Sequence, residues 1–320
     1  MAQSNALSKD LLRGVSRSFY LSMKVLPLEM REPVSLAYLL ARATDTIADT
    51  ADASDELRLQ LLQAIRKRIF EKGKEKKSFY DSLKTDFIAQ QSHPGEKLLL
   101  QRLGECYQWL DGMERADQFF ITTVLGHITN GQIWDLERFA ATPQVALSFV
   151  ENADELKQYT YWVAGSVGEF WTDVGFANGG RHFSDEESVK MKQLGREFGQ
   201  GLQLVNVLRD FGEDLDHGRC YLPKDQLIAA GWDGTGKPSQ KAVTEVRAQW
   251  LQQCRAWLQS GRDYAKRVKS RRVRYATILP CLIAEKTLDA LERAGESALQ
   301  QKVKIPRWQV RMLMVKALFS

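Results

Sequence analysis

Two short stretches of the chain carry acidic side chains at a spacing that suits metal binding: Asp45 with Asp49, and Asp210 with Asp214. On a helix, residues four apart lie on one face with their Cβ atoms about 5–6 Å apart, and like charges at that spacing repel each other. A divalent cation removes this repulsion, and Mg²⁺ typically takes one or two carboxylates together with water and phosphate oxygens. A single pair of this kind is common on exposed helices, so the residues around it must show whether it binds a metal.

Each pair belongs to a longer polar stripe on a helix that is otherwise apolar. The first stripe consists of Tyr38, Arg42, Asp45 and Asp49, and the second consists of Gln203, Asn206, Asp210 and Asp214. A helix that is apolar nearly all round is buried, and buried carboxylates must be paired or must bind a metal. Two buried acidic stripes therefore suggest a shared internal cavity. Internal ion pairs with Arg42 and Arg209 are the structural alternative.

The chain also carries basic side chains that suit phosphate. They are Arg17, Arg42, Arg209, Arg219 and Lys224. A guanidinium group matches phosphate oxygens in a bidentate fashion. Because metal ions and arginines together stabilise a diphosphate as it leaves, these residue types favour diphosphate chemistry.

Five segments carry a resemblance to a known family. They are Ser16–Phe19, Tyr38–Asp49, Tyr159–Gly168, Gln203–Asp214 and Gly218–Pro223. In these segments and in their order, the chain resembles the squalene/phytoene synthase family, the head-to-head prenyl transferases, from about residue 14 to residue 320. A head-to-tail chain elongase or a terpene cyclase would share the metal chemistry but would lack the third segment.

The resemblance implies an all-α fold, a single-domain isoprenoid-synthase helical bundle around a central apolar cavity, with two aspartate-rich motifs that face each other. It also implies Mg²⁺-dependent condensation of two allylic diphosphates through a cyclopropyl diphosphate intermediate. Ionisation leaves a carbocation that water would destroy, so the pocket must exclude water. The alternative of another class is a non-catalytic helical assembly protein of the same fold, but such a protein should have lost the acidic motifs.

The resemblance further assigns roles to individual side chains. The Mg²⁺ ligands would be Asp45, Asp49, Asp210, Glu213 and Asp214. The contacts to diphosphate or metal would be Ser16, Arg17, Arg42, Gln203, Asn206, Arg209 and Arg219. Tyr38 and Tyr159 fall on family tyrosines assigned to the cavity, where they could help proton removal or shield the cation.

Three features favour squalene as the product. The motif Asp45–Asp49, preceded by Arg42, and the opening Ser16–Phe19 resemble the squalene-synthase forms. The tail around Pro280 and Val303–Ile305 resembles a segment associated with cofactor binding in squalene synthases. We therefore expect two farnesyl diphosphates to give presqualene diphosphate, which NADPH then reduces, with Asn206 and Lys304 as cofactor contacts. Against this, Phe211–Pro223 is closer to the phytoene-synthase form, and Pro306 replaces an expected basic residue. Phytoene or dehydrosqualene synthesis, with geranylgeranyl diphosphate as a possible substrate, stays open.

The elements that must position these residues are helices, because apolar residues recur at three and four positions nearly throughout the chain. The predicted helices cover residues 31–47, 52–70, 96–109, 116–139, 154–176, 184–211, 239–268, 276–293 and 308–318. No repeat or Ser/Pro-rich linker interrupts them, which favours one domain over residues 1–320. Gly165, Ser166 and Gly168 lie in mid-helix, where each glycine costs about 1 kcal/mol of helix propensity. This suggests that a substrate chain or another helix passes close by.

Composition sets the remaining expectations. Of 320 residues, 44% are hydrophobic and 27% charged, as in an ordinary globular protein. The net charge of +5 is too small and scattered to indicate a nucleic-acid partner. Four cysteines without CxxC spacing indicate free thiols in a reducing cytoplasm. We find no signal peptide or spanning segment and expect a cytoplasmic protein, with residues 308–320 lying peripherally on the inner face of the membrane or covering the core.

Overall fold

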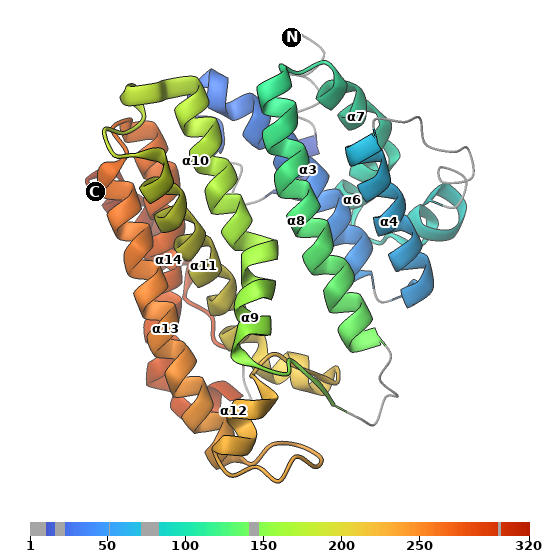
Figure 1. The fold of residues 1–320 in the computed structure, drawn as a ribbon, viewed down its shortest axis with the longest axis vertical. Coiled ribbons are helices and arrows are strands. Elements are labelled where there is room, and N and C mark those ends of the chain that lie inside the picture. Colours follow the sequence, from blue (N-terminus) through green and yellow to red (C-terminus); the bar gives the residue numbers. More distant parts are fainter. Residues whose placement is uncertain (1–10, 17–22, 51, 72–82, 141–146, 300–301) are drawn as a thin grey trace. The chain divides into compact units, whose positions relative to one another are not determined.

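Helices form almost all of the chain that the computed structural model describes, which comprises residues 11–16, 23–50, 52–71, 83–140, 147–299 and 302–320. The fold is all-α, as the sequence predicts, apart from one pair of two-residue strands (Figure 1). The chain divides into two compact units, Met1–Leu136 with Asp173–Gly180, and Glu137–Thr172 with Arg181–Ser320. The single domain expected from the sequence stays a prediction.

The first unit is built around α3 (Leu28–Asp49), the helix of the first acidic pair. It packs against α4 (Asp55–Glu71), α6 (Pro94–Gln101) and α7 (Leu103–Asp111). The unit also contains the π-turn η1 (Leu83–Phe87), the 3₁₀ turn η2 (Ile88–Gln90) and most of α8 (Arg115–Ala140). Leu36, Leu39, Leu40 and Ile47 of α3 are fully buried, so packing fixes the direction in which the polar stripe of this helix points.

Two predicted helices of the first unit have different bounds in the structure. The helix α3 begins at Leu28 rather than at residue 31, so Pro33 lies in its second turn, where its missing N–H removes a helical hydrogen bond. The predicted helix 96–109 is two helices, because Arg102, with φ −105° and ψ 15°, departs from helical geometry between them. The first of these two helices begins at Pro94, and the His93 ring accepts a hydrogen bond from the Glu96 N–H.

The second unit is built around α11 (Ser188–Asp216), the helix of the second acidic pair. It packs against α13 (Gln240–Arg267) and α14 (Arg271–Ala294), which Figure 1 shows in orange and red. The other helical elements are α9 (Ala153–Thr160), the π-turn η3 (Tyr161–Gly165), the first half of α10 (Ser166–Gly179), most of η4 (Gly180–His182), α12 (Lys224–Ala229), η5 (Gly295–Leu299) and α15 (Arg307–Leu318). Serine side chains cap the start of α13 and of α14, which satisfies a backbone N–H in each first turn.

Small residues let α11 approach η3 and α10 backbone to backbone. A Cβ atom added at Gly168 would lie 1.8 Å from the carbonyl oxygen of Gly195, and one added at Gly199 would lie 2.1 Å from that of Ala164. No larger side chain fits at either position unless the helices separate. Of the two explanations for the small residues of this motif, close passage of another helix is therefore confirmed.

The two short strands bring the end of α11 beside the start of α9. β1 (Ser148–Phe149) runs parallel to β2 (Arg219–Cys220), with Ser148 opposite Arg219. Beyond the strands, the Val150 N–H donates to the Cys220 carbonyl at 3.0 Å. Strands of two residues show no alternation of polar and apolar side chains, so the sequence pattern could not predict them.

All four cysteines are buried free thiols, as predicted. Burial raises the pKa of Cys106, Cys220 and Cys281 to about 12, and it raises the pKa of Cys254 as well. Because the thiolate is the reactive form, these cysteines serve packing rather than nucleophilic chemistry.

Candidate active site

The first acidic cluster consists of Asp45 and Asp49 on α3. Asp45 is half-buried and its Oδ1 accepts a hydrogen bond from Gln132 Nε2 of α8 at 2.5 Å. Burial, together with the negative charge of Asp49, raises the pKa of Asp45 to about 6, although Arg42 and Gln132 act in the opposite direction. The carboxylate of Asp45 therefore lies where a negative charge is unfavourable unless a cation joins it.

Gln132 also presents an oxygen without a donor. Its Oε1 is buried and accepts no hydrogen bond from any described residue. A buried polar atom without a partner costs free energy, and a neutral amide oxygen beside a carboxylate is a ligand type that hard cations accept. The pair formed by Asp45 and Gln132 thus has the chemistry of an incomplete cation site.

Arg42 pairs with Glu96 of α6 rather than with the aspartates. Burial alone would lower the pKa of Arg42, but Glu96 and Asp45 outweigh it and the pKa is raised. Arg42 therefore does not form the internal ion pair with the acidic stripe that the alternative interpretation predicted, because its carboxylate partner is Glu96. Arg42 Nε remains buried without a hydrogen bond among the described residues.

Two further predicted residues of the first unit lie close together. The Tyr38 hydroxyl donates to the carbonyl oxygen of Val15 at 3.3 Å, which brings Tyr38 to the residue before Ser16. Ser16 is 3% exposed, and its Oγ has no hydrogen bond to any described residue. The next predicted residue, Arg17, lies outside the described residues.

The second acidic cluster consists of Asp210, Glu213 and Asp214 on α11. Arg209 forms a bidentate contact with Asp210, with Nε 3.0 Å from Oδ1 and Nη2 2.6 Å from Oδ2. Lys302 Nζ, from the segment before α15, lies 3.2 Å from Asp210 Oδ1 and 2.5 Å from Glu213 Oε2. For Arg209, the structure thus confirms the alternative interpretation, an internal ion pair with the acidic stripe.

These cations determine the charge state of the second cluster. Burial alone would raise the pKa of Asp210, but Arg209 and Lys302 outweigh it and hold the pKa below its usual value. Glu213 raises the pKa of Lys302, and Asp210 adds to this effect. Lys302 therefore carries a full positive charge between the carboxylates of Asp210 and Glu213.

The remaining predicted residues of the second unit have mixed surroundings. Asn206 Nδ2 donates to Gln203 Oε1 at 3.3 Å on α11, and Arg219 lies half-buried in β2. Tyr159 is buried and stacks on Tyr221 with ring centroids 5.2 Å apart. Lys304 is exposed and has no ion pair with the described residues.

A π-turn lies inside the motif that includes Tyr159. The helix from α9 to α10 widens at Tyr161–Gly165, and such turns occur frequently at functional sites because they rotate side chains away from the regular helical register. Tyr161 donates to Glu169 Oε2 at 3.1 Å, and Arg196 lies over its ring. Regular helical periodicity predicted the helix but not this widening.

The carboxylates are less buried than the polar stripes predicted. Asp45, Asp210 and Asp214 are half-buried, whereas Asp49 and Glu213 are exposed. The apolar faces of both helices are buried as expected. The predicted burial of the acidic stripes is confirmed only in part, because the surroundings of Asp45 are buried enough to raise its pKa, whereas Asp49 and Glu213 are exposed.

The residues of the two clusters fit Mg²⁺ as a ligand type, but they form no closed cage. Among the described residues, no three acidic, histidine or cysteine side chains are close enough to hold a metal ion by themselves. Mg²⁺ usually keeps several waters and binds through one or two carboxylates plus substrate phosphates. The oxygen of Gln132 that lacks a donor and the raised pKa of Asp45 fit such a partial site.

Three contributors to the site were missed by sequence reasoning: Gln132, Glu96 and Lys302. Each acts on a predicted residue from a distant part of the chain, and a single sequence contains no signal for that proximity. Gln132 alone left a trace, as a polar amide within a largely apolar helix.

Comparison with known proteins gives one matching family model and several relatives. A family model described as squalene/phytoene synthase matches residues 12–309. The phytoene synthase of Thermus thermophilus is 30% identical over 227 residues, which cover 66% of this chain and 73% of the relative. The presqualene diphosphate synthase of Zymomonas mobilis is 28% identical over 295 residues, which cover 92% of this chain and 82% of the relative.

A solved structure shows the same fold. The complex of TcSQS with the ligand E5700 matches with a TM-score of 0.75 at 21% identity, covering 98% of this chain and 86% of that chain. The chain therefore has the all-helical isoprenoid-synthase fold. It spans only 33% of one longer relative, the bifunctional lycopene cyclase/phytoene synthase of Blakeslea trispora.

Proposed function

The chain belongs to the squalene/phytoene synthase family of head-to-head prenyl transferases, and from this we propose that it condenses two allylic diphosphates in a magnesium-dependent reaction. The observation that carries the proposal is the first acidic cluster. Asp45 has a pKa raised to about 6 beside a buried amide oxygen without a donor. This arrangement is unfavourable alone and favourable once a cation and its phosphate ligand are bound.

In the proposed reaction, Mg²⁺ supplies positive charge that neutralises the diphosphate as it leaves. Asp45, Asp49, Asp210 and Asp214 would hold the metal ions, and Glu213 would assist. The chain's own cations would complete the binding of the anion. Arg42 and Arg209 lie beside the acidic clusters. Each guanidinium group could donate some of its N–H groups to phosphate oxygens while it keeps a hydrogen bond to its carboxylate partner.

Entry of a cation at the second cluster requires Lys302 to move. Its Nζ contacts the oxygens of Asp210 and Glu213 that a metal would use. A displaced ammonium group would remain close to the bound anion, where its charge favours diphosphate. In the absence of substrate, Lys302 would thus block the binding of cations from solution to Asp210 and Glu213. The negative charge of the substrate diphosphate would then attract the ammonium group away from these carboxylates.

Other predicted residues would act on the apolar part of the substrate and on the diphosphate. Tyr38 and Tyr159 present aromatic rings that can stabilise a carbocation. Ser16 has a buried hydroxyl without a partner among the described residues, which suits a hydrogen bond to a ligand. Arg17, Gln203, Asn206 and Arg219 complete the proposed set of diphosphate contacts.

We further propose farnesyl diphosphate as the substrate, presqualene diphosphate as the intermediate and squalene as the product of reduction by NADPH. The support is the sequence resemblance of the first motif and of Val303–Ile305. Synthesis of phytoene or dehydrosqualene remains the second candidate, supported by the form of Phe211–Pro223.

Product analysis separates these candidates. Wild-type protein is incubated with farnesyl diphosphate and Mg²⁺, with and without NADPH, and the lipids are identified by mass spectrometry. Squalene formed only with NADPH is the expected result. Dehydrosqualene formed regardless of reductant, or conversion of geranylgeranyl diphosphate alone, would overturn the proposed product while leaving the family reaction intact.

Location is proposed from the sequence as cytoplasmic, with peripheral contact to the inner face of the membrane. Among the described helices, none combines the length and the apolar character needed to cross a bilayer. Sedimentation of the protein with and without vesicles tests the peripheral contact.

A further inference from the structure

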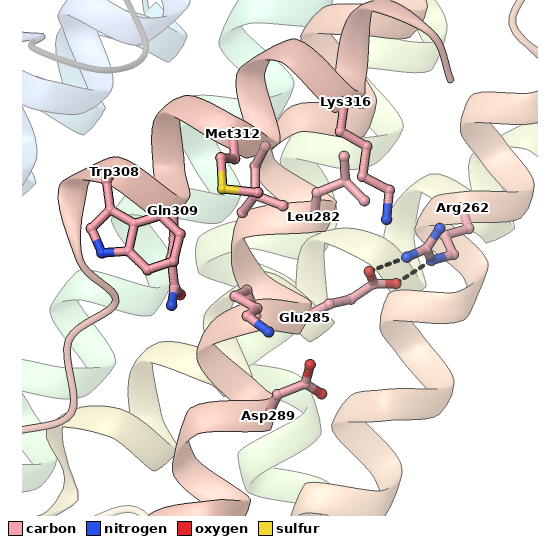
Figure 2. A pocket seen from close by; sticks show the side chains of 10 residues that line it. Arg262, Leu282, Glu285, Asp289, Trp308, Gln309, Met312 and Lys316 are labelled. Carbon is pink, nitrogen blue, oxygen red and sulfur yellow. Dashed lines mark hydrogen bonds and ion pairs between the residues drawn. The ribbon is translucent and has the colours of Figure 1, made fainter.

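The second unit contains a groove whose lining includes no residue of the acidic clusters. It has a volume of about 430 Å³ and is formed where α15 packs on α14, with one residue from α13 (Figure 2). This volume lies within the range of about 300–1,000 Å³ that is typical of small-molecule sites. None of its lining residues belongs to the predicted catalytic or binding set.

One wall of the groove is apolar and open to water. Trp308 and Met312, one helical turn apart on α15, are 59% and 61% exposed, and Leu282 and Leu313 line the groove beside them. Figure 2 shows Trp308 and Met312 on the same helix above α14. Large apolar side chains left this exposed gain free energy when an apolar ligand covers them.

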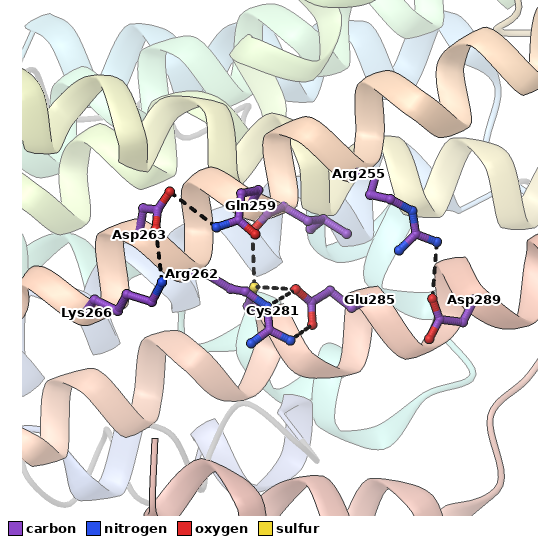
Figure 3. A network of polar contacts seen from close by, with 9 residues as sticks. Arg255, Gln259, Arg262, Asp263, Lys266, Cys281, Glu285 and Asp289 are labelled. Atoms are coloured by element: carbon purple, nitrogen blue, oxygen red, sulfur yellow. Dashed lines mark hydrogen bonds and ion pairs between the residues drawn. The ribbon is translucent and has the colours of Figure 1, made fainter.

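Both carboxylates of the groove are paired with arginines of α13. Glu285 forms a bidentate ion pair with Arg262, which Figures 2 and 3 both show. Asp289 accepts a hydrogen bond from Arg255 Nη2 at 3.2 Å (Figure 3), and Arg255 also pairs with Glu292.

The two lysines of the groove have no such partners. Lys286 is half-buried and Lys316 is exposed, and neither forms a hydrogen bond or ion pair through its ammonium group with any described residue. A half-buried ammonium group without a partner favours an anion beside it. The helix α15 itself carries three basic residues, Arg307, Arg311 and Lys316, and no acidic one.

We propose that this groove binds an anionic amphiphile, a molecule with one apolar chain and one negatively charged head. The chain would cover Trp308, Met312 and Leu313, and the head would pair with Lys286 and Lys316. An inorganic anion would leave the apolar wall in water, a neutral apolar molecule would leave the lysines unpaired, and a cation would meet like charge. The amphiphile can come from a bilayer or from solution as an alkyl phosphate, and the same groups recognise both.

Calorimetric titration of the full-length protein with dodecyl phosphate below its micelle concentration tests the proposal. The titration is run in EDTA, so that it does not depend on metal-bound substrate at the acidic clusters. We expect saturable binding with one equivalent at the groove, at least tenfold tighter than binding of inorganic phosphate or of an uncharged dodecyl glycoside. Equal affinity for the charged and uncharged amphiphiles, or no binding of dodecyl phosphate, would overturn the proposal.

Variants locate the binding. The double substitution Lys286→Gln and Lys316→Gln should weaken binding of dodecyl phosphate at least tenfold, whereas Lys237→Gln with Lys241→Gln, at exposed positions outside the groove, should leave it unchanged. Circular dichroism and thermal unfolding confirm that each variant is folded. Unchanged binding in the groove variant would place the amphiphile elsewhere and contradict the assignment.

Vesicles distinguish the two sources of the ligand. If a bilayer lipid is the occupant, the protein should sediment with anionic phosphatidylglycerol vesicles and the groove variant should not. If a soluble amphiphile is the occupant, dodecyl phosphate should bind while wild type and groove variant sediment equally. Loss of prenyl-transferase activity would change neither measurement, so a failure of the proposed function and a failure of this inference are separable.

Discussion

In the first acidic cluster Asp45 is held by the neutral amide of Gln132, whereas in the second cluster Asp210 is held by the cationic groups of Arg209 and Lys302. The pKa of Asp45 is raised to about 6 by burial, and the pKa of Asp210 is held below its usual value by its cations. Both clusters have aspartates four apart on a long helix, so the sequence spacing does not distinguish them. The difference comes from the side chains that distant helices bring to each.

The comparison indicates two ways of preparing a cation site. Among the described residues, no positively charged group contacts Asp45 directly, so a divalent cation would supply this charge. The second cluster already contains an ammonium group, so a divalent cation must compete with it. A bound divalent cation should therefore add a missing positive charge at the first cluster, whereas at the second cluster it should only replace the positive charge of Lys302.

The largest expected effect is on turnover. Asp45→Asn and Asp210→Asn each keep the side-chain shape but remove the charge that would hold the metal ion. Each should reduce product formation from farnesyl diphosphate by about two to three orders of magnitude, with an unchanged circular dichroism spectrum. Asp154→Asn, at a position 93% exposed, is the matched control and should retain activity. Wild-type turnover in either cluster variant would rule out that aspartate as a metal ligand.

The next effect concerns metal affinity at the first cluster. Gln132→Leu removes both the hydrogen bond to Asp45 and the amide oxygen without a donor. Since residues that orient metal ligands contribute about 10- to 100-fold to affinity, Mn²⁺ titration followed by electron paramagnetic resonance should show weaker binding in this range. Gln193→Leu, on the exposed face of α11, serves as control. Unchanged Mn²⁺ affinity in the Gln132 variant would show that the amide of Gln132 does not contribute to metal binding.

Stability of the metal-free protein should depend on pH with opposite sign at the two clusters. The pKa of Asp45 is higher in the folded state, so its contribution is most favourable in acid and is lost as the pH rises through about 6. Asp45→Asn should therefore stabilise the protein at pH 7.5 by about 1–3 kcal/mol and by less at pH 5. The pKa of Asp210 is lowered, so its ion pairs stabilise near neutral pH and are lost in acid.

Asp210→Asn should consequently destabilise the protein at pH 7.5, by about 0.5–1 kcal/mol because the pair is partly exposed. Urea unfolding in EDTA at both pH values measures the two effects. Shifts of the same sign for the two variants would contradict the difference between the clusters.

The smallest effect tests the competing ammonium group. Lys302→Gln removes the cation between Asp210 and Glu213, so Mn²⁺ should bind several-fold more tightly, consistent with a partly exposed charge pair of about 1 kcal/mol. Lys304→Gln, two residues further along the chain, should leave Mn²⁺ affinity unchanged. Weaker Mn²⁺ binding in the Lys302 variant would show that the lysine supports the site rather than competing for it.

The sequence predicted the fold class and nearly all helices, because long amphipathic segments such as residues 239–268 carry the helical period over many turns. It also predicted the two aspartate motifs, because their spacing is local. It could not predict that Asp45 meets Gln132 or that Lys302 meets Glu213, because those contacts depend on how distant segments pack. The π-turn at Tyr161–Gly165 was not predicted either, because one widened turn hardly changes the periodicity of the helix that contains it.

Release of inorganic diphosphate from farnesyl diphosphate in the presence of Mg²⁺ tests most directly whether both clusters serve one reaction. It is measured for wild type, Asp45→Asn, Asp210→Asn and the double variant. Residues that act as a unit give strongly non-additive losses, so the account predicts that either single variant loses nearly all release and that the double variant loses little more. Release near the wild-type rate in one single variant, or losses that simply multiply in the double variant, would contradict it.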